Sequence, residues 1–327
     1  MRRILANLLC EDDLARRPAS PSRPVLATVA RMAPLLRAFA RDGDRLWSPA
    51  PLEPIPDGSR LILESGPLRN LAPAEEVLAW CETPEAAAHR IASRPAVISW
   101  EAPLRELLWT LPVPSPSVVA TVHHRAFHLQ VAEEIGCVLP GARMVESLNE
   151  LDRLPLPRVW VLKAPLSASG RHRYIARDEH ELSNPKARRT VERLFERHGA
   201  LLFEPWMDRI GDFGVSALLT QDELRIVGIH GQRVDRKGQF AGIDLQPDLS
   251  EEDRDRLLKT VEAVAAALRR AGYVGPFGID AWSYRRADGV VVLNPLGEIN
   301  ARMTFGLVAW AEAGRRHMIN PQRDSFA

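Results

Sequence analysis

The side chains best suited to chemistry lie near the C-terminus, where two polar residues alternate along a segment that follows an apolar run. Glu298 and Asn300 are two positions apart, so on an extended strand they lie on the same face. Their carboxylate and amide oxygens are hard ligands, of the kind that Mg²⁺ combines with water and nucleotide phosphates. Asp280, on the preceding predicted strand, is the third candidate metal ligand. Chance polar alternation is the competing interpretation, and the apolar run before the segment weighs against it.

The face on which Asp280 lies depends on the turn that joins the two predicted strands. The Asp-Gly pair at 288–289 predicts a hairpin. A two-residue turn sets Asp280 opposite Gly297, and a three-residue turn sets it opposite Leu296. Only the three-residue turn, or a bulge near Gly297, places Asp280 beside Glu298. The sequence leaves these alternatives open.

A second candidate segment begins where the predicted strand 158–163 ends in Lys163. The chain has only four lysines among its 43 basic residues, and Lys163 is the first of them. A lysine at a strand end can reach phosphate oxygens, and a loop of small residues lets backbone N–H groups approach them. The small residues that follow are Ser167, Ser169 and Gly170. Two arginines that flank His172 suit bidentate contacts with phosphate or carboxylate. A solvated β-turn is the alternative interpretation of this segment.

Together these segments resemble the ATP-grasp superfamily, over roughly residues 118–306. Members of that family carry a strand-end Lys, a glycine-rich phosphate loop and a Glu-x-Asn-x-Arg metal segment. Lys163 matches the first feature, and Glu298, Asn300 and Arg302 match the last. The loop departs from the family pattern because it has a single glycine, Gly170.

The resemblance assigns nucleotide contacts to further residues. The segment around Glu204 is similar to the family's interlobe hinge, in which a Glu precedes the backbone that pairs with the adenine edge. Trp206 and Met207 then form the apolar floor, and Asp212 holds the ribose hydroxyls in place of the commoner Glu. Arg125 stands where the family often has a Lys that is a second phosphate ligand.

Two arginines are the candidate catalytic residues. The resemblance implies that Arg302 holds the transferred phosphoryl group or the carboxylate oxygen, and Arg233 is the second candidate for that role. A surface position in a β-hairpin is the simpler interpretation of Arg233.

The function implied by the resemblance is that of an ATP-dependent carboxylate–amine ligase. ATP phosphorylates a small-molecule carboxylate, such as an amino acid or peptide, and an amine attacks the acyl phosphate, with release of ADP and phosphate. The implied cofactors are ATP and Mg²⁺, with Mn²⁺ as the alternative metal. An ATP-grasp kinase and a non-catalytic nucleotide-binding module remain open alternatives, and a homodimer is compatible with the sequence. Substrate identity depends on the loops around 172 and 230–233.

The implied organisation is an N-terminal open α/β domain followed by a two-lobed ATP-grasp fold, so the fold class is α/β plus α+β. A segment with three prolines, 111–117, predicts the linker. The expected division is an α/β domain over 1–116, a lobe with the phosphate loop over 117–200, and a lobe with the adenine hinge and metal site over 201–327.

Hydrophobic periodicity, caps and turn residues predict the elements that position these residues. The predicted strands are 3–9, 60–64, 96–100, 158–163, 200–204, 214–220, 224–229, 277–284 and 290–293. The predicted helices are 26–41, 73–80, 84–91, 121–135, 185–197 and 250–270.

Composition and missing motifs exclude other classes of protein. The 327 residues are 46% hydrophobic and carry a net charge of +1, which argues against an electrostatic nucleic-acid binder. No apolar run reaches the length of a membrane span. Three cysteines, distant in sequence and without a CxxC pair, argue against a disulfide framework or structural zinc and favour the reducing cytoplasm.

Three motif-based alternatives also fail. No Walker A loop, Rossmann fingerprint or G-x-S-x-G elbow is present. His124 and His128 have the i, i+4 spacing of a metal pair, but a third ligand is missing. They are therefore interpreted as part of the surface of an amphipathic helix.

Overall fold

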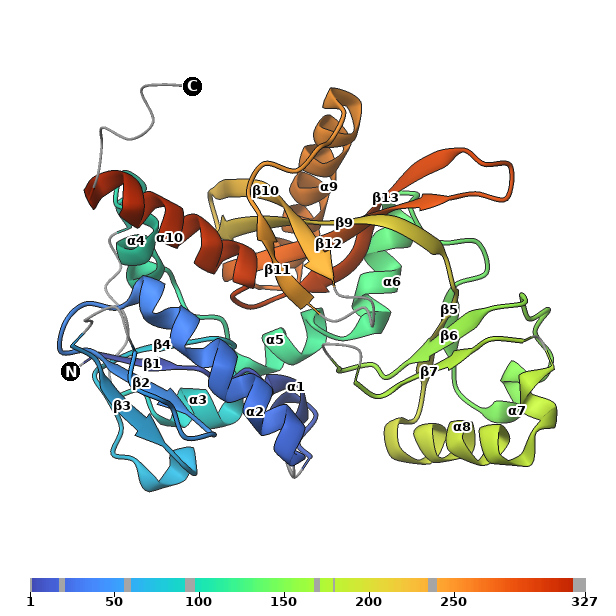
Figure 1. The fold of residues 1–327 in the computed structure, drawn as a ribbon, viewed down its shortest axis with the longest axis horizontal. Helices are drawn as coiled ribbons and strands as arrows, with labels where there is room; N and C mark the ends of the chain where they lie inside the picture. The colour runs from blue at the N-terminus through green and yellow to red at the C-terminus, as the bar shows by residue number, and fades with distance from the viewer. Residues whose placement is uncertain are drawn as a thin grey trace.

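The computed structural model describes residues 2–17, 21–55, 60–91, 98–167, 171–178, 180–234 and 240–319. Within them the chain forms a mixed α/β structure with three sheets (Figure 1). We call these the N-terminal sheet, the middle sheet and the five-stranded sheet. None of the helices in the described ranges is long and apolar enough to cross a bilayer.

The N-terminal sheet is parallel and has the strand order β3-β2-β1-β4. Its strands are β1 (Arg2–Leu5), β2 (Arg45–Ser48), β3 (Ile62–Ser65) and β4 (Glu76–Ala79). The helical segments of this part are α1 (Cys10–Leu14), α2 (Arg23–Met32), η1 (Ala33–Phe39), η2 (Leu68–Asn70), α3 (Pro84–Ala88) and α4 (Leu104–Thr110). The first helix begins shortly after β1 ends, so its acidic residues lie at the carboxyl end of a parallel strand, where open α/β sheets bind ligands.

Three local predictions for this part are wrong. The predicted helix 73–80 contains β4, because its consecutive apolar residues are buried on both faces of a parallel sheet and have no helical period. The predicted helix 26–41 divides at Ala33, where Pro34 begins a 3₁₀ segment. For the predicted strand 96–100, residues 98–100 form no strand, and 96–97 lie outside the described residues.

The middle sheet is antiparallel, with the order β5-β8-β6-β7, and it has a separate hydrophobic core. Its strands are β5 (Arg143–Val145), β6 (Trp160–Lys163), β7 (Arg173–Ala176) and β8 (Leu201–Pro205). Its helices are α7 (Leu148–Leu151), η3 (Glu181–Ser183) and α8 (Pro185–His198). Alternation along the strands sends Trp160, Leu162 and Phe203 into this core. Lys163, Leu202 and Glu204 therefore lie on the opposite face.

The five-stranded sheet is antiparallel, with the order β11-β10-β9-β12-β13. Its strands are β9 (Asp208–Leu219), β10 (Leu224–Val234), β11 (Phe240–Asp244), β12 (Gly275–Arg285) and β13 (Val291–Asn300). Its helices are α9 (Glu251–Arg270), which packs against β9, β10 and β13, and α10 (Phe305–Ile319), which packs against β9 and β10.

Two short helices connect the N-terminal part to the middle sheet. They are α5 (Pro116–Val122) and α6 (Arg125–Glu134). The sequence predicted one helix over 121–135, but the chain breaks at 123–124, where the His124 Nδ1 accepts a hydrogen bond from the Ala126 N–H and caps the second helix. α6 packs against β13 (Figure 1).

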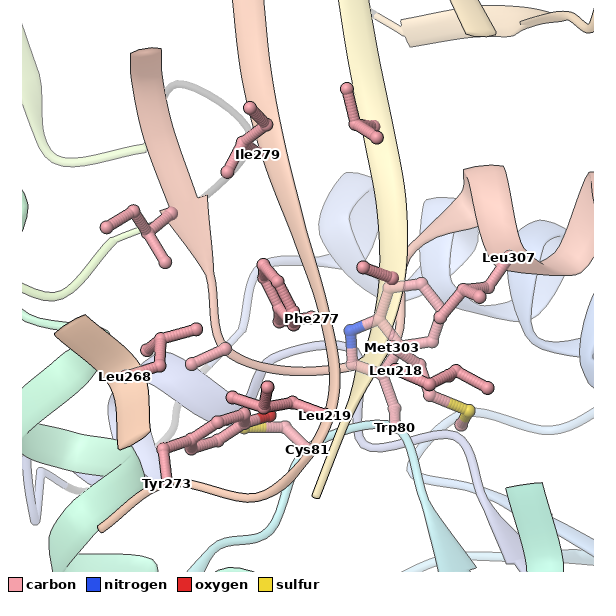
Figure 2. Packing of buried hydrophobic residues seen from close by; sticks show 14 of the residues in the cluster. Trp80, Cys81, Leu218, Leu219, Leu268, Tyr273, Phe277, Ile279, Met303 and Leu307 are labelled. Carbon is pink, nitrogen blue, oxygen red and sulfur yellow. The ribbon is translucent and has the colours of Figure 1, made fainter. Parts of the chain in front are cut away.

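One continuous core joins the N-terminal part to the five-stranded sheet (Figure 2). Trp80 packs against Phe305 with ring centroids 4.7 Å apart, and the Met303 N–H donates to the Trp80 carbonyl at 2.9 Å. Leu218 and Leu307 lie beside them. This packing places the carboxyl end of β1 next to the end of β13, where the predicted metal residues lie.

Candidate active site

The predicted metal residues face one another across β12 and β13. Asp280 is directly opposite Glu298, and the register shifts between Asp280 and Trp282. The bulge alternative is therefore the one that the structure adopts, together with a three-residue turn closed by the hydrogen bond from the Arg286 N–H to the Val290 carbonyl. Directly opposed residues share a face, so Asp280, Glu298 and Asn300 present their oxygens together.

Neutral amides hold the Asp280 carboxylate. The Gln232 Nε2 donates to its Oδ1 at 2.7 Å, and the Asn300 Nδ2 donates to its Oδ2 at 3.1 Å. Removal from water, together with the negative charge of Glu298, raises the pKa of Asp280 to about 6. For Glu298, burial alone would raise the pKa, but the surrounding cations, Arg125 foremost, lower it to about 2. The pair therefore carries an excess of negative charge above pH 6.

Lys163 lies on the other side of the site, at the end of β6. Its Nζ contacts the Glu204 carboxylate, which comes from the neighbouring strand β8. Burial lowers the pKa of Lys163, and the Glu204 carboxylate opposes that shift. Burial would raise the pKa of Glu204, yet the Lys163 charge holds it below its usual value. The two predicted nucleotide residues are thus an ion pair on the face of the middle sheet that lies away from its core.

Arg125, at the start of α6, connects the two sides. Its backbone and its Nε bond the carbonyls of Pro165 and Ala164 at 3.0 Å, and its Nη2 donates to the Ser167 carbonyl at 3.1 Å. The same Nη2 lies 3.2 Å from the Glu298 Oε1. Arg125 is 6% exposed. It therefore connects the segment after Lys163 to β13.

A small pocket lies between α6, the loop after it, β8 and β13. Its wall is mostly apolar, with a few polar side chains. The apolar residues include Leu129, Val138, Leu139, Leu202 and Leu296, and the polar ones are His128, Glu204 and Asn294. A mostly apolar cleft with a few convergent polar groups is the usual form of a small-molecule site.

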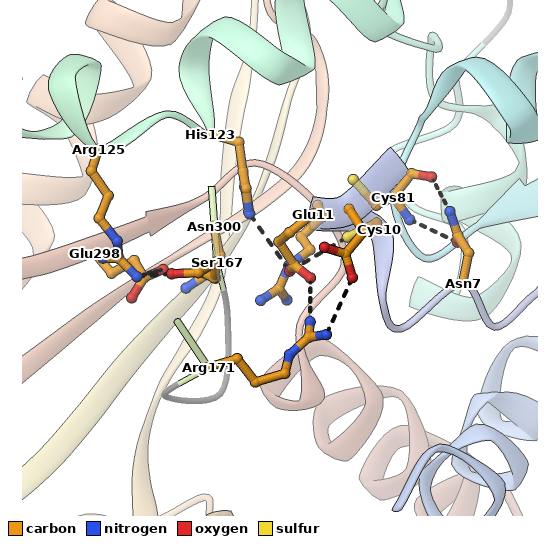
Figure 3. Close-up of polar contacts among 12 residues, drawn as sticks. Asn7, Cys10, Glu11, Cys81, His123, Arg125, Ser167, Arg171, Glu298 and Asn300 are labelled. Carbon is orange, nitrogen blue, oxygen red and sulfur yellow. Dashed lines mark hydrogen bonds and ion pairs between the residues drawn. The ribbon is translucent and has the colours of Figure 1, made fainter. Parts of the chain in front are cut away.

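A third group of charges lies at the boundary with the N-terminal part (Figure 3). Glu11 of α1 is 2% exposed, and its Oε2 accepts from the Arg171 Nη2 at 2.9 Å. Its Oε1 lies 3.8 Å from both the His123 Nε2 and the Arg302 Nε. Burial alone would raise the pKa of Glu11, but the His123 imidazole and the charge of Arg302 lower it to about 2.

Arg302, the main candidate catalytic residue, is held in place by this group. Besides the approach to Glu11, its Nη1 donates to the Met303 carbonyl at 3.1 Å, and its guanidinium lies 5.4 Å from the Trp80 ring centroid. Burial lowers the pKa of Arg302, but Glu11 and the other nearby acidic groups together raise it above its usual value. The guanidinium is therefore charged and held near Glu11, and Arg302 follows Asn300 by two residues in the chain.

The predicted hinge residues follow β8. Trp206 is 41% exposed, and its N–H donates to the Val159 carbonyl at 3.0 Å. Met207 is half-buried, and Asp212 lies opposite Trp282 in the sheet, on the face that carries Asp280. Arg209 pairs with Asp212 at 3.3 Å and stacks 3.7 Å from the Trp282 ring centroid.

The structure does not bring every predicted residue to the site. Arg233 is exposed, and strand alternation turns it to the face opposite that of Gln232, which bonds Asp280. Ser167 is buried and contributes its carbonyl to Arg125. Ser169 and Gly170 lie outside the described residues.

Several residues of the site were missed by the sequence argument. The interpretation of His128 as a surface residue is wrong, because it is 6% exposed and lines the pocket. His230, expected in a substrate loop, is 3% exposed on β10, against Gly214 and Gly306. Glu11 carried one usable signal, its position after the first parallel strand.

The residues present fit the groups that the resemblance implies. Two carboxylates and an amide oxygen are a donor set suited to Mg²⁺. In the described ranges no group of three or more His, Cys, Asp and Glu is placed to hold a metal ion. Two buried nitrogens, Arg125 Nη1 and His128 Nε2, lack partners among the described residues, as donors for an anionic ligand would.

Comparisons with known proteins bear on the fold. No protein-family model and no curated protein matches the sequence. A biotin carboxylase–β,γ-ATP complex from Campylobacter jejuni matches with a TM-score of 0.57 and 12% identity, over 96% of this chain and 70% of that chain. An ADP complex of N5-carboxyaminoimidazole ribonucleotide synthetase matches with a TM-score of 0.54 and 12% identity, over 93% and 70%. The Staphylococcus aureus N5-carboxyaminoimidazole synthetase complexed with ADP matches with a TM-score of 0.52 and 9% identity, over 93% of this chain and 70% of that chain. The chain has the fold of ATP-grasp enzymes.

Proposed function

We propose that the protein is an ATP-dependent ligase that joins a small-molecule carboxylate to an amine through an acyl phosphate. The observation that carries the proposal is the 3.2 Å contact between Arg125 and Glu298. It joins the candidate phosphate-binding residues to the candidate metal ligands. Such an arrangement suits phosphoryl transfer, in which catalysis is mainly positioning and electrostatic stabilisation.

Each side of the site has a distinct task in this proposal. Lys163 and Arg125 offset the negative charge of the nucleotide phosphates. Asp280, Glu298 and Asn300 hold Mg²⁺, which when bound supplies further positive charge to those phosphates. The apolar pocket between α6, β8 and β13 accepts part of the nucleotide. The segment from Glu204 to Asp212 remains the proposed adenine and ribose contact.

The end of the site near the N-terminal part suits the carboxylate substrate. Arg302 and Arg171 meet there with His123, and each lies within 4 Å of Glu11. Arg302 is placed to hold the carboxylate oxygen or the transferred phosphoryl group. The proposed division of labour follows the expected boundaries: 1–116 for the substrate side, 117–200 for phosphate binding, and 201–327 for the hinge and metal.

The test is to identify what the protein makes from ATP. Given amino acids, small peptides or other carboxylates, it should release ADP, with free phosphate appearing only as an amine is joined. Replacing the amine by hydroxylamine should give a hydroxamate, because an acyl phosphate is a reactive mixed anhydride. A stable phosphorylated product without hydroxamate indicates the kinase alternative, and nucleotide binding without turnover indicates a non-catalytic module. Release of AMP would contradict the proposal of an ATP-grasp ligase and its kinase alternative.

A further inference from the structure

Two buried nitrogens on one side of α6 have no hydrogen-bond partner in the described part of the structure. They are the Nη1 of Arg125 and the Nε2 of His128. Each residue is 6% exposed, and three positions on a helix place their side chains on the same face. Buried polar atoms in folded proteins are nearly always paired, because an unpaired one costs free energy. Two such atoms on one face of a helix therefore indicate a ligand with acceptor atoms.

The surroundings of His128 show where that ligand sits. His128 lines the pocket between α6, β8 and β13, with Glu204 and Asn294 as its polar neighbours there. Glu298 and Lys163 are close enough to act on it electrostatically. His128 thus lies within electrostatic reach of both the candidate metal residue Glu298 and the strand-end Lys163.

The charge state of His128 suits a hydrogen-bond donor that adds no positive charge. Burial lowers the pKa of its imidazole to about 4, against an opposing effect of Glu298. The ring is therefore neutral near pH 7 and carries one N–H. In the tautomer that is protonated on Nε2, this N–H has no partner among the described residues and needs an acceptor.

We propose that His128 is a nucleotide-binding residue that donates a hydrogen bond from Nε2 to a phosphate oxygen, beside Arg125 and Lys163. The inference rests on the proposed function, because it requires a nucleotide in this site. A phosphate group has several acceptor oxygens, so it satisfies both orphaned nitrogens of α6 at once. A nucleobase offers uncharged ring-nitrogen acceptors, which match the Arg125 guanidinium less well than phosphate oxygens do.

The experiment compares His128→Leu with His128→Gln by calorimetric titration with ADP and Mg²⁺, and with adenosine alone. Leucine fills a similar volume without a donor, whereas the glutamine amide reaches about as far as the His Nε2. Loss of a hydrogen bond to a charged group should weaken ADP binding about 10- to 30-fold in His128→Leu. Adenosine affinity should change less than about twofold, and His128→Gln should recover most of the ADP affinity.

Controls separate this inference from the proposed function. Gln130→Leu changes an exposed residue of the same helix and should leave ADP affinity unchanged. Thermal unfolding without ligand should show that both His128 variants are folded. Wild-type ADP affinity in a folded His128→Leu variant overturns the inference alone, and so does an equal loss of ADP and adenosine binding, which indicates a base contact. Absence of ADP binding by the wild type overturns the proposed function and this inference together.

Discussion

Glu11 and Asp280 are both carboxylates withdrawn from water at the candidate site, but the charges around them are opposite. Glu11 has Arg171, Arg302 and His123 within 4 Å, and its pKa lies near 2. Asp280 is held by two neutral amides and has Glu298 directly opposite, and its pKa lies near 6. The negative charge of Glu11 is balanced by cationic side chains of the protein, whereas that of Asp280 has only neutral amides as hydrogen-bond partners.

This difference distinguishes a structural carboxylate from one suited to a ligand. A buried charge that is fully paired contributes little when replaced together with its partners, but removing it alone leaves cations uncompensated. A pair of carboxylates that repel one another costs free energy in the protein alone, and a divalent cation offsets that cost. The comparison therefore places Glu11 at the junction between the N-terminal part and the site, and it supports the proposal that Asp280 and Glu298 bind a metal.

The largest effect should come from removing charge at the metal side. Glu298→Gln keeps the shape of the side chain but reduces the negative charge available to Mg²⁺. Because a bound metal contributes several kcal/mol to charge stabilisation, ADP release should fall by about 10³-fold. Initial rates with saturating Mg-ATP measure it. Glu262→Gln, an exposed position on α9, is the matched control and should retain its rate. A rate of ADP release by Glu298→Gln within tenfold of the wild-type rate would contradict a metal site at Glu298.

The shared strand face of Glu298 and Asn300 could be predicted from the sequence, and the reason is local. Glu298 and Asn300 are two residues apart on one strand, and Lys163 ends a strand that has a plain apolar pattern, so neighbours in sequence carry the information. The register of Asp280 was left open because a bulge depends on how Trp282 packs against Gly297, whose absent side chain leaves room for the ring. The alternation of residues along a strand does not predict that contact.

The Glu11 side could not be predicted, because its partners are distant in sequence. Arg171 and Arg302 reach Glu11 only after the N-terminal part packs on the five-stranded sheet. The same holds for His128, whose burial depends on the break between α5 and α6 and on contact with β13. Helical spacing alone made it a surface residue. In both cases tertiary packing decided the role of a side chain that local patterns left ambiguous.

An intermediate effect, on stability, should appear at Glu11. Glu11→Gln removes a buried carboxylate that pairs with Arg171 and lies near Arg302, so the free energy of unfolding at pH 7 should fall by about 3 kcal/mol. Because the pKa of Glu11 is lowered from 4.5 to about 2, its stabilisation is present above pH 4.5 and is lost as the pH falls towards 2. The difference between wild type and variant should therefore shrink below pH 4.5. Urea unfolding at pH 7 and pH 4 measures it, with Glu262→Gln as the control. A constant difference at both pH values would show that ionisation of Glu11 plays no part.

The smallest effect, and the one of opposite sign, should appear at Asp280. The pKa of Asp280 is raised from 3.8 to about 6, so the folded state binds its proton more tightly than the unfolded chain does. Ionisation therefore costs stability as the pH rises from about 4 to 6, and the cost remains above pH 6. Asp280→Asn removes the charge, and the amides of Gln232 and Asn300 can rotate to keep their hydrogen bonds.

Without metal at pH 8, Asp280→Asn should thus be more stable than wild type by about 1–2 kcal/mol. With saturating Mg²⁺ and ADP the order should reverse, because only the wild type gains the full stabilisation by the bound metal. At pH 4 without metal the two proteins should be nearly equal. Thermal unfolding under these three conditions measures the pattern, with Glu11→Gln alongside, since that variant is destabilised with or without metal. If Asp280→Asn is the less stable protein at pH 8 in the absence of metal, Asp280 is a structural carboxylate like Glu11, and the contrast between the two groups disappears.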